Sequence, residues 1–233
     1  MYRILPLLAF TLAACVDTTG PSAPTKAPTT TSPPRQTSST AAKNFISVVK
    51  RVEPVAEREC RQRAPSLNCD FQIVVDDRPN QPSNAFQTVD RNGRPILAFT
   101  LALIADARNQ DEIAFIMGHE AAHHIQGHLP KTQQRAVAGA LIFGALASLG
   151  GAGQAGVQAA QEVGATVGSR TYSKEFELEA DGLGTRIAHK AGYNPVRGAA
   201  FFTRIPDPGD QFLGTHPPNA SRVETVRQTA SQL

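Results

Sequence analysis

The segment Asn109–His128, with the sequence NQDEIAFIMGHEAAHHIQGH, constrains the fold of this chain more than any other. Asn109 is a favourable N-cap, and Glu112 follows three residues later, which is the spacing of a capping box. Asp111 and Glu112 also place negative charge at the positive end of the helix dipole. Apolar residues recur at helical spacing in the next two turns, so the pattern predicts one helix over residues 109–128.

This predicted helix carries the motif H-E-x-x-H, formed by His119, Glu120 and His123. Residues four apart on a helix project from the same face, about 6 Å apart along the axis, so the two histidines can bind one ion. Zinc commonly takes tetrahedral nitrogen and oxygen ligands in proteins. Glu120 projects beside such an ion, where it can take a proton from a bound water molecule. We therefore predict that His119 and His123 bind zinc and that Glu120 is the catalytic base.

Two histidines at this spacing can also lie on an ordinary polar helix face, so the motif needs support from elsewhere in the chain. His124 and His128 form a second pair with the same spacing, but Ile125 stands where a base would be needed. We interpret His124 and His128 as solvated histidines or as residues that support a metal ligand.

Residues 173–190, SKEFELEADGLGTRIAHK, offer the third protein ligand that a catalytic zinc site needs. Ser173 is a good cap and Gly192 lies just past the end, so this segment predicts a second helix. Glu177 and Asp181 are four residues apart and share a face. One of them can bind the metal while the other orients a ligand histidine. Without the upstream motif, this acidic cluster would be interpreted as a solvated helix face.

The motif H-E-x-x-H followed by E-x-x-x-D, here Glu177–Asp181, resembles the gluzincin zinc metallopeptidases, a family that includes HtpX, BepA and the CAAX prenyl proteases. The resemblance covers roughly residues 43–230 and includes three weaker motifs: Asn84–Phe86, Gly192–Pro195 and Thr215–Pro217. The family pattern places the metal-binding glutamate four residues before the aspartate. The resemblance therefore implies Glu177, rather than Glu179, as the third ligand, with Asp181 orienting a ligand.

The resemblance also implies roles for two residues near the C-terminus. In related proteins the histidine of the Thr-His-Pro segment, here His216, lies near the zinc, where it either helps the reaction or blocks the metal. The arginine six residues later, Arg222, belongs to the same pocket. Without the resemblance, His216 before two prolines would be an ordinary loop histidine.

Residues 1–14, MYRILPLLAFTLAA, combine a short basic start with an apolar run, which is typical of a secretion signal. The run Leu12–Cys15 resembles a bacterial lipobox and implies acylation of Cys15, which would anchor the chain to a membrane. The alternative is an ordinary signal peptide with a chance cysteine. Residues 15–42 are rich in Thr, Pro and Ser, which predicts a disordered tether. Val16 replaces the aspartate that commonly retains enterobacterial lipoproteins at the inner membrane, which favours the outer membrane, facing the periplasm.

Residues 43–233 predict one α+β domain, mainly helical and zincin-like, with a small β-sheet beside the active-site helix. An apolar stripe over residues 43–64 is interrupted by Pro54, which predicts a kink or two short helices. Residues 71–75, 85–90 and 95–99 predict strands, and Asn92–Gly93 between the last two predicts a hairpin. One strand should border the active-site cleft, where a peptide could add to its edge.

Cys60 and Cys69 are the cysteines that remain beside Cys15, and a pair of cysteines in an exported chain predicts a disulfide. Residues 136–168 are rich in Ala and Gly and carry no charge before Glu162. Their dense apolar part is too short to span a bilayer. We interpret them as a helical hairpin packed on the core. The alternatives are a mobile lid or an exposed apolar surface that faces lipid or a client polypeptide.

The net charge of +3 gives no nucleic-acid signature. The motifs and the resemblance together predict a zinc-dependent endopeptidase of the bacterial cell envelope, with one zinc ion per chain. Its substrates would be misfolded or unassembled envelope polypeptides. Two alternatives stay open: a latched, chaperone-like binding protein with little proteolysis, and a structural lipoprotein whose zinc has four protein ligands. The sequence carries no indication of an oligomeric state.

Overall fold

The structure, a computed structural model, describes residues 36–170, 173–209 and 216–233, all of which belong to the unit Pro34–Leu233. The predicted signal peptide, Cys15, most of the tether and Thr215 lie outside the described residues. The elements in chain order are α1 (Ser38–Arg63), β1 (Gln72–Asp76), β2 (Ala85–Val89), β3 (Pro95–Thr100), α2 (Leu101–Asp106), α3 (Gln110–Ile125), α4 (His128–Leu149), α5 (Gln154–Arg170), α6 (Ser173–Lys190), α7 (Pro195–Gly198), the 3₁₀ helix η1 (Ala199–Thr203) and α8 (Asn219–Ala230).

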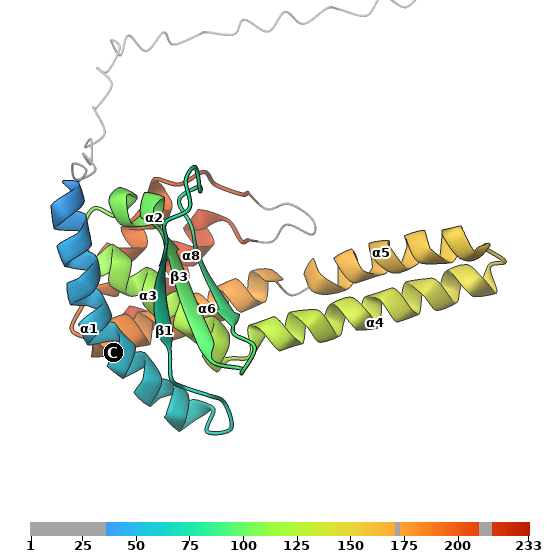
Figure 1. Cartoon of the computed structure of the whole chain (residues 1–233), viewed down its shortest axis with the longest axis horizontal. Coiled ribbons are helices and arrows are strands. Elements are labelled where there is room, and N and C mark those ends of the chain that lie inside the picture. The colour runs from blue at the N-terminus through green and yellow to red at the C-terminus, as the bar shows by residue number, and fades with distance from the viewer. Residues whose placement is uncertain (1–35, 171–172, 210–215) are drawn as a thin grey trace, which may run out of the picture. The chain divides into compact units, whose positions relative to one another are not determined.

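Three strands form a small mixed sheet in the order β1–β3–β2 (Figure 1). β1 runs parallel to β3 and β2 runs antiparallel to it, with Gln87 opposite Leu97. Gly93, in the turn between β2 and β3, has a φ of 77°, which glycine adopts without a steric penalty. The hairpin predicted from Asn92–Gly93 is therefore confirmed, and so is the fold class, α+β and mainly helical.

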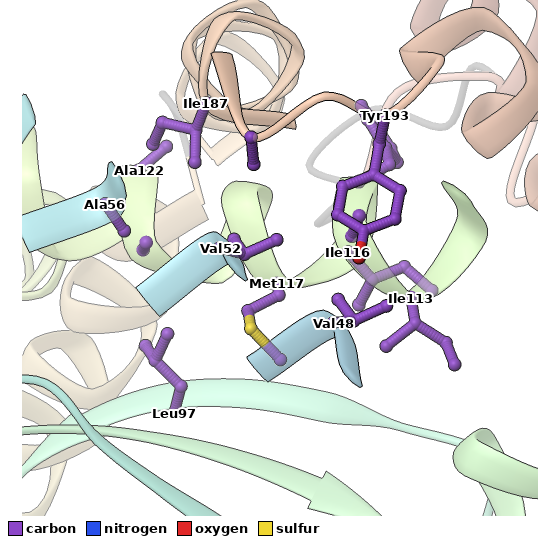
Figure 2. Close-up of a cluster of buried hydrophobic side chains, with 14 of the residues drawn as sticks. Val48, Val52, Ala56, Leu97, Ile113, Ile116, Met117, Ala122, Ile187 and Tyr193 are labelled. Carbon is purple, nitrogen blue, oxygen red and sulfur yellow. The ribbon is translucent and has the colours of Figure 1, made fainter. Parts of the chain in front are cut away.

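Helix α3 lies at the centre of the hydrophobic core. Of its sixteen residues, Gln110 and His123 are the two that are not buried. Figure 2 shows side chains from α1, β3 and α6 gathered around Met117 of α3. Burying a side chain of this size stabilises the fold by about 1.5–3 kcal/mol. Because almost every residue of α3 is buried, its polar motif lies below the surface of the molecule.

The N-terminal cap of α3 agrees with the capping-box signal. The Asn109 side chain accepts a hydrogen bond from the backbone N–H of Glu112 at 3.1 Å. The Glu112 carboxylate accepts from the backbone N–H of Arg108 at 2.8 Å and forms a buried ion pair with Arg204 at 2.7 Å. The start of α3 is thereby fixed both locally and to a residue far along the chain.

The prediction of one helix over residues 109–128 is wrong at its C-terminal end. Helix α3 ends at Ile125, and Gly127 adopts a φ of 66° before α4 begins at His128. A glycine in this left-handed conformation commonly ends a helix, because it can turn the chain without a clash of a Cβ atom. The break changes the direction in which His128 points.

Of the two alternatives predicted around Pro54, a kink or two short helices, the two short helices are wrong. Helix α1 continues from Ser38 to Arg63 with Pro54 inside it, and it begins five residues before the predicted domain boundary at residue 43. Val52 and Val55, on either side of the proline, are both buried in the same core. We attribute the continuity to this burial, which offsets the backbone hydrogen bond that proline cannot make.

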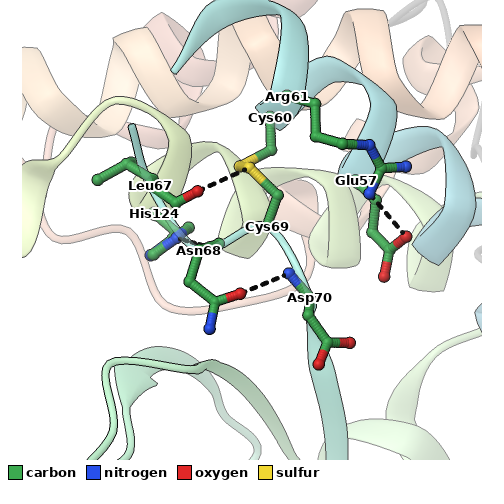
Figure 3. Close-up of a disulfide and its surroundings, with 8 residues drawn as sticks. All are labelled: Glu57, Cys60, Arg61, Leu67, Asn68, Cys69, Asp70 and His124. Carbon is green, nitrogen blue, oxygen red and sulfur yellow. Dashed lines mark hydrogen bonds and ion pairs between the residues drawn. A yellow bond between two sulfur atoms is a disulfide. The ribbon is translucent and has the colours of Figure 1, made fainter. Parts of the chain in front are cut away.

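A disulfide joins Cys60, near the end of α1, to Cys69, just before β1, with the two Cα atoms 5.7 Å apart (Figure 3). The predicted pairing is therefore confirmed. Within the loop that the disulfide closes, the backbone carbonyl of Asn68 accepts a hydrogen bond from His124 Nε2 at 2.8 Å. His124 is 8% exposed, so its interpretation as a solvated histidine is wrong, and its bond ties this loop to α3.

Helices α4 and α5 form an antiparallel hairpin that extends to one side of the other helices (Figure 1). Their backbones touch at glycines: a Cβ atom on Gly164 would lie 2.2 Å from the carbonyl oxygen of Gly139. The predicted hairpin is confirmed, but its packing on the core is wrong, because α4 and α5 pack mainly against each other. Several large apolar side chains of α4 are exposed: Val137, Leu141, Ile142, Leu146 and Leu149. In the part of the chain that the structure describes, no helix has the length and apolarity needed to cross a membrane.

Candidate metal centre

Three side chains from α3 and α6 converge on one point. The Nε2 atoms of His119 and His123 are 3.0 Å apart, and the Glu177 carboxylate oxygens lie 3.5 Å and 3.3 Å from them, respectively. Ligand atoms held at about 2.0–2.2 Å on a tetrahedral zinc ion are about 3.3–3.6 Å apart. The two separations from Glu177 fall in this range, the separation of the two histidine nitrogens is slightly shorter, and the donor types are those of a zinc site. Among the described residues, this is the group of histidine and acidic side chains close enough to share a metal.

Asp181 fixes the ring of His119. Its carboxylate is fully buried and lies 2.9 Å from His119 Nδ1, so this nitrogen carries the proton and Nε2 is left for a metal. Arg222 binds both Asp181 oxygens, at 2.7 Å and 2.8 Å, and stacks over the ring of Phe202. Burial opposes a charge on His119, but the hydrogen bonds to Asp181 and Glu177 outweigh it and raise its pKa to about 10. The site therefore stabilises positive charge at this ring.

Glu177 is held as an anion. Burial alone would raise its pKa, but hydrogen bonds from His119, His123 and His216 outweigh burial and lower the pKa well below 4.5. The ionised form is the one that binds a metal, so the electrostatics of the site agree with the role of a ligand.

Glu120 lies beside the ligands and lines the pocket in front of them. Its side chain is buried, and burial raises its pKa, while the neighbouring His119 and His123 act in the opposite direction. A carboxylate with a raised pKa is a better proton acceptor near neutral pH than an exposed one.

The structure also brings His216 and Arg222 to this centre. His216 Nδ1 lies 3.3 Å from a Glu177 oxygen, and the His216 side chain is about half exposed. Arg222 Nη2 lies 3.4 Å from the same oxygen, and Arg222 is buried. The two residues thus approach Glu177 from the segment that follows η1, as the resemblance implied for the pocket.

A pocket of about 990 Å³ opens in front of the metal centre. The wall of the pocket includes residues 83–87, which lead into β2 and form its first part. The aromatic side chains of Phe115, Phe176 and Phe202 also line it. Within the described sheet, β2 pairs with β3 along one edge and has no strand partner along the other. The prediction that a strand borders the cleft is therefore confirmed. The first residues of α4, His128, Leu129 and Thr132, line the pocket, whereas no residue of 136–168 does.

His128 is 3% exposed, so of its two predicted interpretations the solvated histidine is wrong, and its position beside His123 agrees with the other, a residue that supports a metal ligand. What the sequence analysis missed is the turn that brings it there. Its Nδ1 lies 2.9 Å from His123 Nδ1, and its Nε2 lies 3.1 Å from Glu179 Oε2. Burial lowers the pKa of His128 to about 4, against the opposing effect of Glu179. Gly127 was the signal that could have revealed the turn, since glycine after a helical run marks a helix end.

Comparison with known proteins identifies the family to which this chain is similar. The model of Peptidase family M48 matches residues 43–230 of this chain. The beta-barrel assembly-enhancing protease of Escherichia coli is 30% identical over 151 residues, which are 57% of this chain and 30% of that protein. Metalloprotease LoiP of Escherichia coli is 26% identical over 133 residues, which are 55% of this chain and 53% of LoiP. The matched part thus spans about a third to a half of the length of these relatives.

Proposed function

The chain belongs to peptidase family M48, and we propose that it is a zinc-dependent endopeptidase of the bacterial cell envelope. The observation that carries this proposal is the convergence of His119, His123 and Glu177 beside the buried Glu120. Three ligands from the protein leave one position of a tetrahedral ion open, which is the arrangement of a catalytic rather than a structural zinc site.

In this proposal His119, His123 and Glu177 hold one zinc ion. The bound metal would supply Lewis acidity for the scissile carbonyl and for a water molecule. Glu120 takes the proton of the attacking water and passes it to the leaving amine. Asp181 keeps Nε2 of His119 directed at the metal, and Arg222 holds Asp181 in place.

The substrate that suits this pocket is an extended polypeptide segment. β2 lines the pocket and has an edge without a strand partner among the described strands, so a peptide can add to it by main-chain hydrogen bonds. Unfolded or misfolded envelope proteins present such segments. The name of the Escherichia coli relative, beta-barrel assembly-enhancing protease, refers to beta-barrel assembly, which agrees with an envelope substrate. The lipobox-like Cys15 would keep the enzyme at the outer membrane, facing the periplasm.

The test is zinc content and cleavage of unfolded casein by the full chain, compared with Glu120→Gln. We expect one zinc ion in both proteins and cleavage by the wild type only. Glu162→Gln makes the same chemical change at an exposed position of α5 and serves as the matched control, with unchanged cleavage. A wild-type chain that is folded and binds no zinc would refute the proposed site.

A second candidate function is a latched, chaperone-like binding protein, and the position of His216 favours keeping it. His216 lies against Glu177, where it can either assist the reaction or block the metal. His216→Ala separates the two, because a latch predicts that cleavage rises and a catalytic role predicts that it falls. Zinc content should stay the same in both cases, because His216 is not among the three ligands of the proposal.

A further inference from the structure

We propose that His128 is a positioning residue that holds the ring of His123 in the orientation needed for metal binding. This inference rests on the proposed metal site, and it assigns a role to a residue outside the H-E-x-x-H and E-x-x-x-D motifs. Asp181 does the same for His119 by a carboxylate contact to Nδ1. For His123, the side chain that meets Nδ1 is His128, at 2.9 Å.

The proton positions follow from the contacts. His123 faces Glu177 and His119 with Nε2, so a metal bound there leaves the ring proton on Nδ1, which becomes a donor. The partner atom, His128 Nδ1, must then be an acceptor, which places the His128 proton on Nε2. That nitrogen lies 3.1 Å from Glu179 Oε2, an acceptor. Each donor in the series from His123 through His128 to Glu179 thus meets an acceptor.

The backbone is shaped to allow this contact. On a continuous helix, a residue five positions after His123 would lie about 140° around the axis and would face away from it. Gly127, with its φ of 66°, ends α3 and turns the chain so that the first residue of α4 points back toward His123. A residue with a Cβ atom would be strained in that backbone conformation.

The ring of His128 is itself held in place. It stacks on Phe176 of α6, with ring centroids 4.5 Å apart and an angle of 11° between the planes, and it is almost completely buried. Glu179, on the same helix as Phe176, contacts the far nitrogen. A ring held by a stacked ring on its face and by a carboxylate at its far nitrogen can fix its neighbour, and contacts of this kind orient ligand histidines in metal sites.

The experiment measures the zinc dissociation constant of the folded full chain by competition with a chelator. His128→Phe keeps a ring that can stack on Phe176 but removes the acceptor, and we expect it to weaken zinc binding about 10–100-fold. His128→Asn places an oxygen where Nδ1 was, and it should restore affinity close to that of the wild type. His124→Phe makes the same change at a buried histidine that bonds to the Asn68 carbonyl instead, and it should leave zinc affinity unchanged.

The outcomes separate this proposal from the proposed function. If the wild type binds zinc and His128→Phe binds it equally well, the positioning role is refuted and the metal site stands. If the wild type binds no zinc, the proposed function itself fails. If His128→Phe does not fold, the proposal is tested instead by nitrogen NMR of the zinc-loaded wild type, which reports which ring nitrogen of each histidine carries the proton. We expect the proton on Nε2 of His128 and on Nδ1 of His123, and a proton on His128 Nδ1 would overturn the proposal.

Discussion

Gly118 in α3 and Gly184 in α6 bring the backbones of the two ligand-bearing helices into contact. A Cβ atom on Gly184 would lie 2.7 Å from the backbone nitrogen of His119, and one on Gly118 would lie 2.8 Å from the carbonyl oxygen of Gly184. No side chain fits between the helices at this point. The close approach allows Glu177 of α6 to reach the two histidines of α3.

We predict that Gly184→Ala separates α3 from α6, although Gly184 contributes no ligand to the proposed metal site. Overpacking of this kind typically costs about 1–3 kcal/mol of unfolding free energy, and the displaced Glu177 should also weaken zinc binding. Urea unfolding and chelator competition measure the two effects. Gly182→Ala is the control, because its Cβ would meet Thr229 Oγ1 at an ordinary 3.7 Å. If Gly184→Ala is as stable as Gly182→Ala and binds zinc as tightly, the close contact between α3 and α6 is not needed for either property.

We predict that Arg222→Met destabilises the fold strongly. Arg222 binds both oxygens of Asp181, which is fully buried, so the substitution removes two of the bonds that stabilise this buried carboxylate and leaves His119 as its remaining partner. Breaking one side of a buried ion pair typically costs about 3–5 kcal/mol of unfolding free energy. The same change at the exposed Arg227 of α8 should have little effect, and chemical denaturation compares the two. A loss no larger than that of Arg227→Met would contradict this account.

Glu59 gives a prediction about pH. It lies in α1, is buried, and accepts hydrogen bonds from Lys190 of α6 and Arg63. Burial would raise its pKa, but the bonds from Lys190 and Arg63 outweigh burial and lower the pKa below 4.5. Because the folded pKa is depressed, the stabilisation is present above the unfolded value and is lost as the pH falls through the folded one.

The stability difference between the wild type and Glu59→Gln should therefore be largest at neutral pH and should shrink in acid. Denaturant unfolding at a series of pH values measures it. Glu224→Gln, at an exposed position of α8, should give a small difference at every pH. A difference for Glu59→Gln that stays constant into acid would mean that the pair with Lys190 contributes nothing to the acid dependence.

The disulfide between Cys60 and Cys69 gives a fourth prediction. Its loop spans nine positions of sequence, and closing a loop of this length should contribute about 2–3 kcal/mol of unfolding free energy in the chain-entropy model. The double substitution Cys60→Ser and Cys69→Ser should lower stability by that amount, measured by urea unfolding. Adding a reductant should lower the stability of the wild type and leave the double variant unchanged. An equal response of both proteins would show that the reductant acts elsewhere.

Three features that the sequence predicted correctly depend on spacing within one element. The Asn109 cap, the Asn92–Gly93 turn and the shared face of Glu177 and Asp181 each follow from local backbone geometry. The same holds for the fold class, because helical and strand periods are visible in short windows. The ion pair of Glu112 with Arg204 joins residues far apart in sequence, and no local signal points to it.

The errors have a common physical origin. At Pro54 and at the Ala/Gly-rich hairpin, tertiary packing decided between local alternatives that the sequence left open. At His128, one glycine changed the direction of the chain, and its partner Glu179 lies on a different helix. The glycine was visible in the sequence, but its effect on the metal centre depends on where α6 lies. Such contacts are set by the assembled core and not by spacing.

The α4–α5 hairpin is an insertion between the two halves of the metal centre, because His119 and His123 precede it and Glu177 follows it. A zinc ion bound by all three would act as a cross-link between the two ends of the insertion. If zinc affinity differs between two tilts of the hairpin, metal occupancy and tilt are linked thermodynamically. A partner that holds the exposed face of α4 in one tilt would change zinc affinity by the same factor by which zinc changes the affinity for that partner.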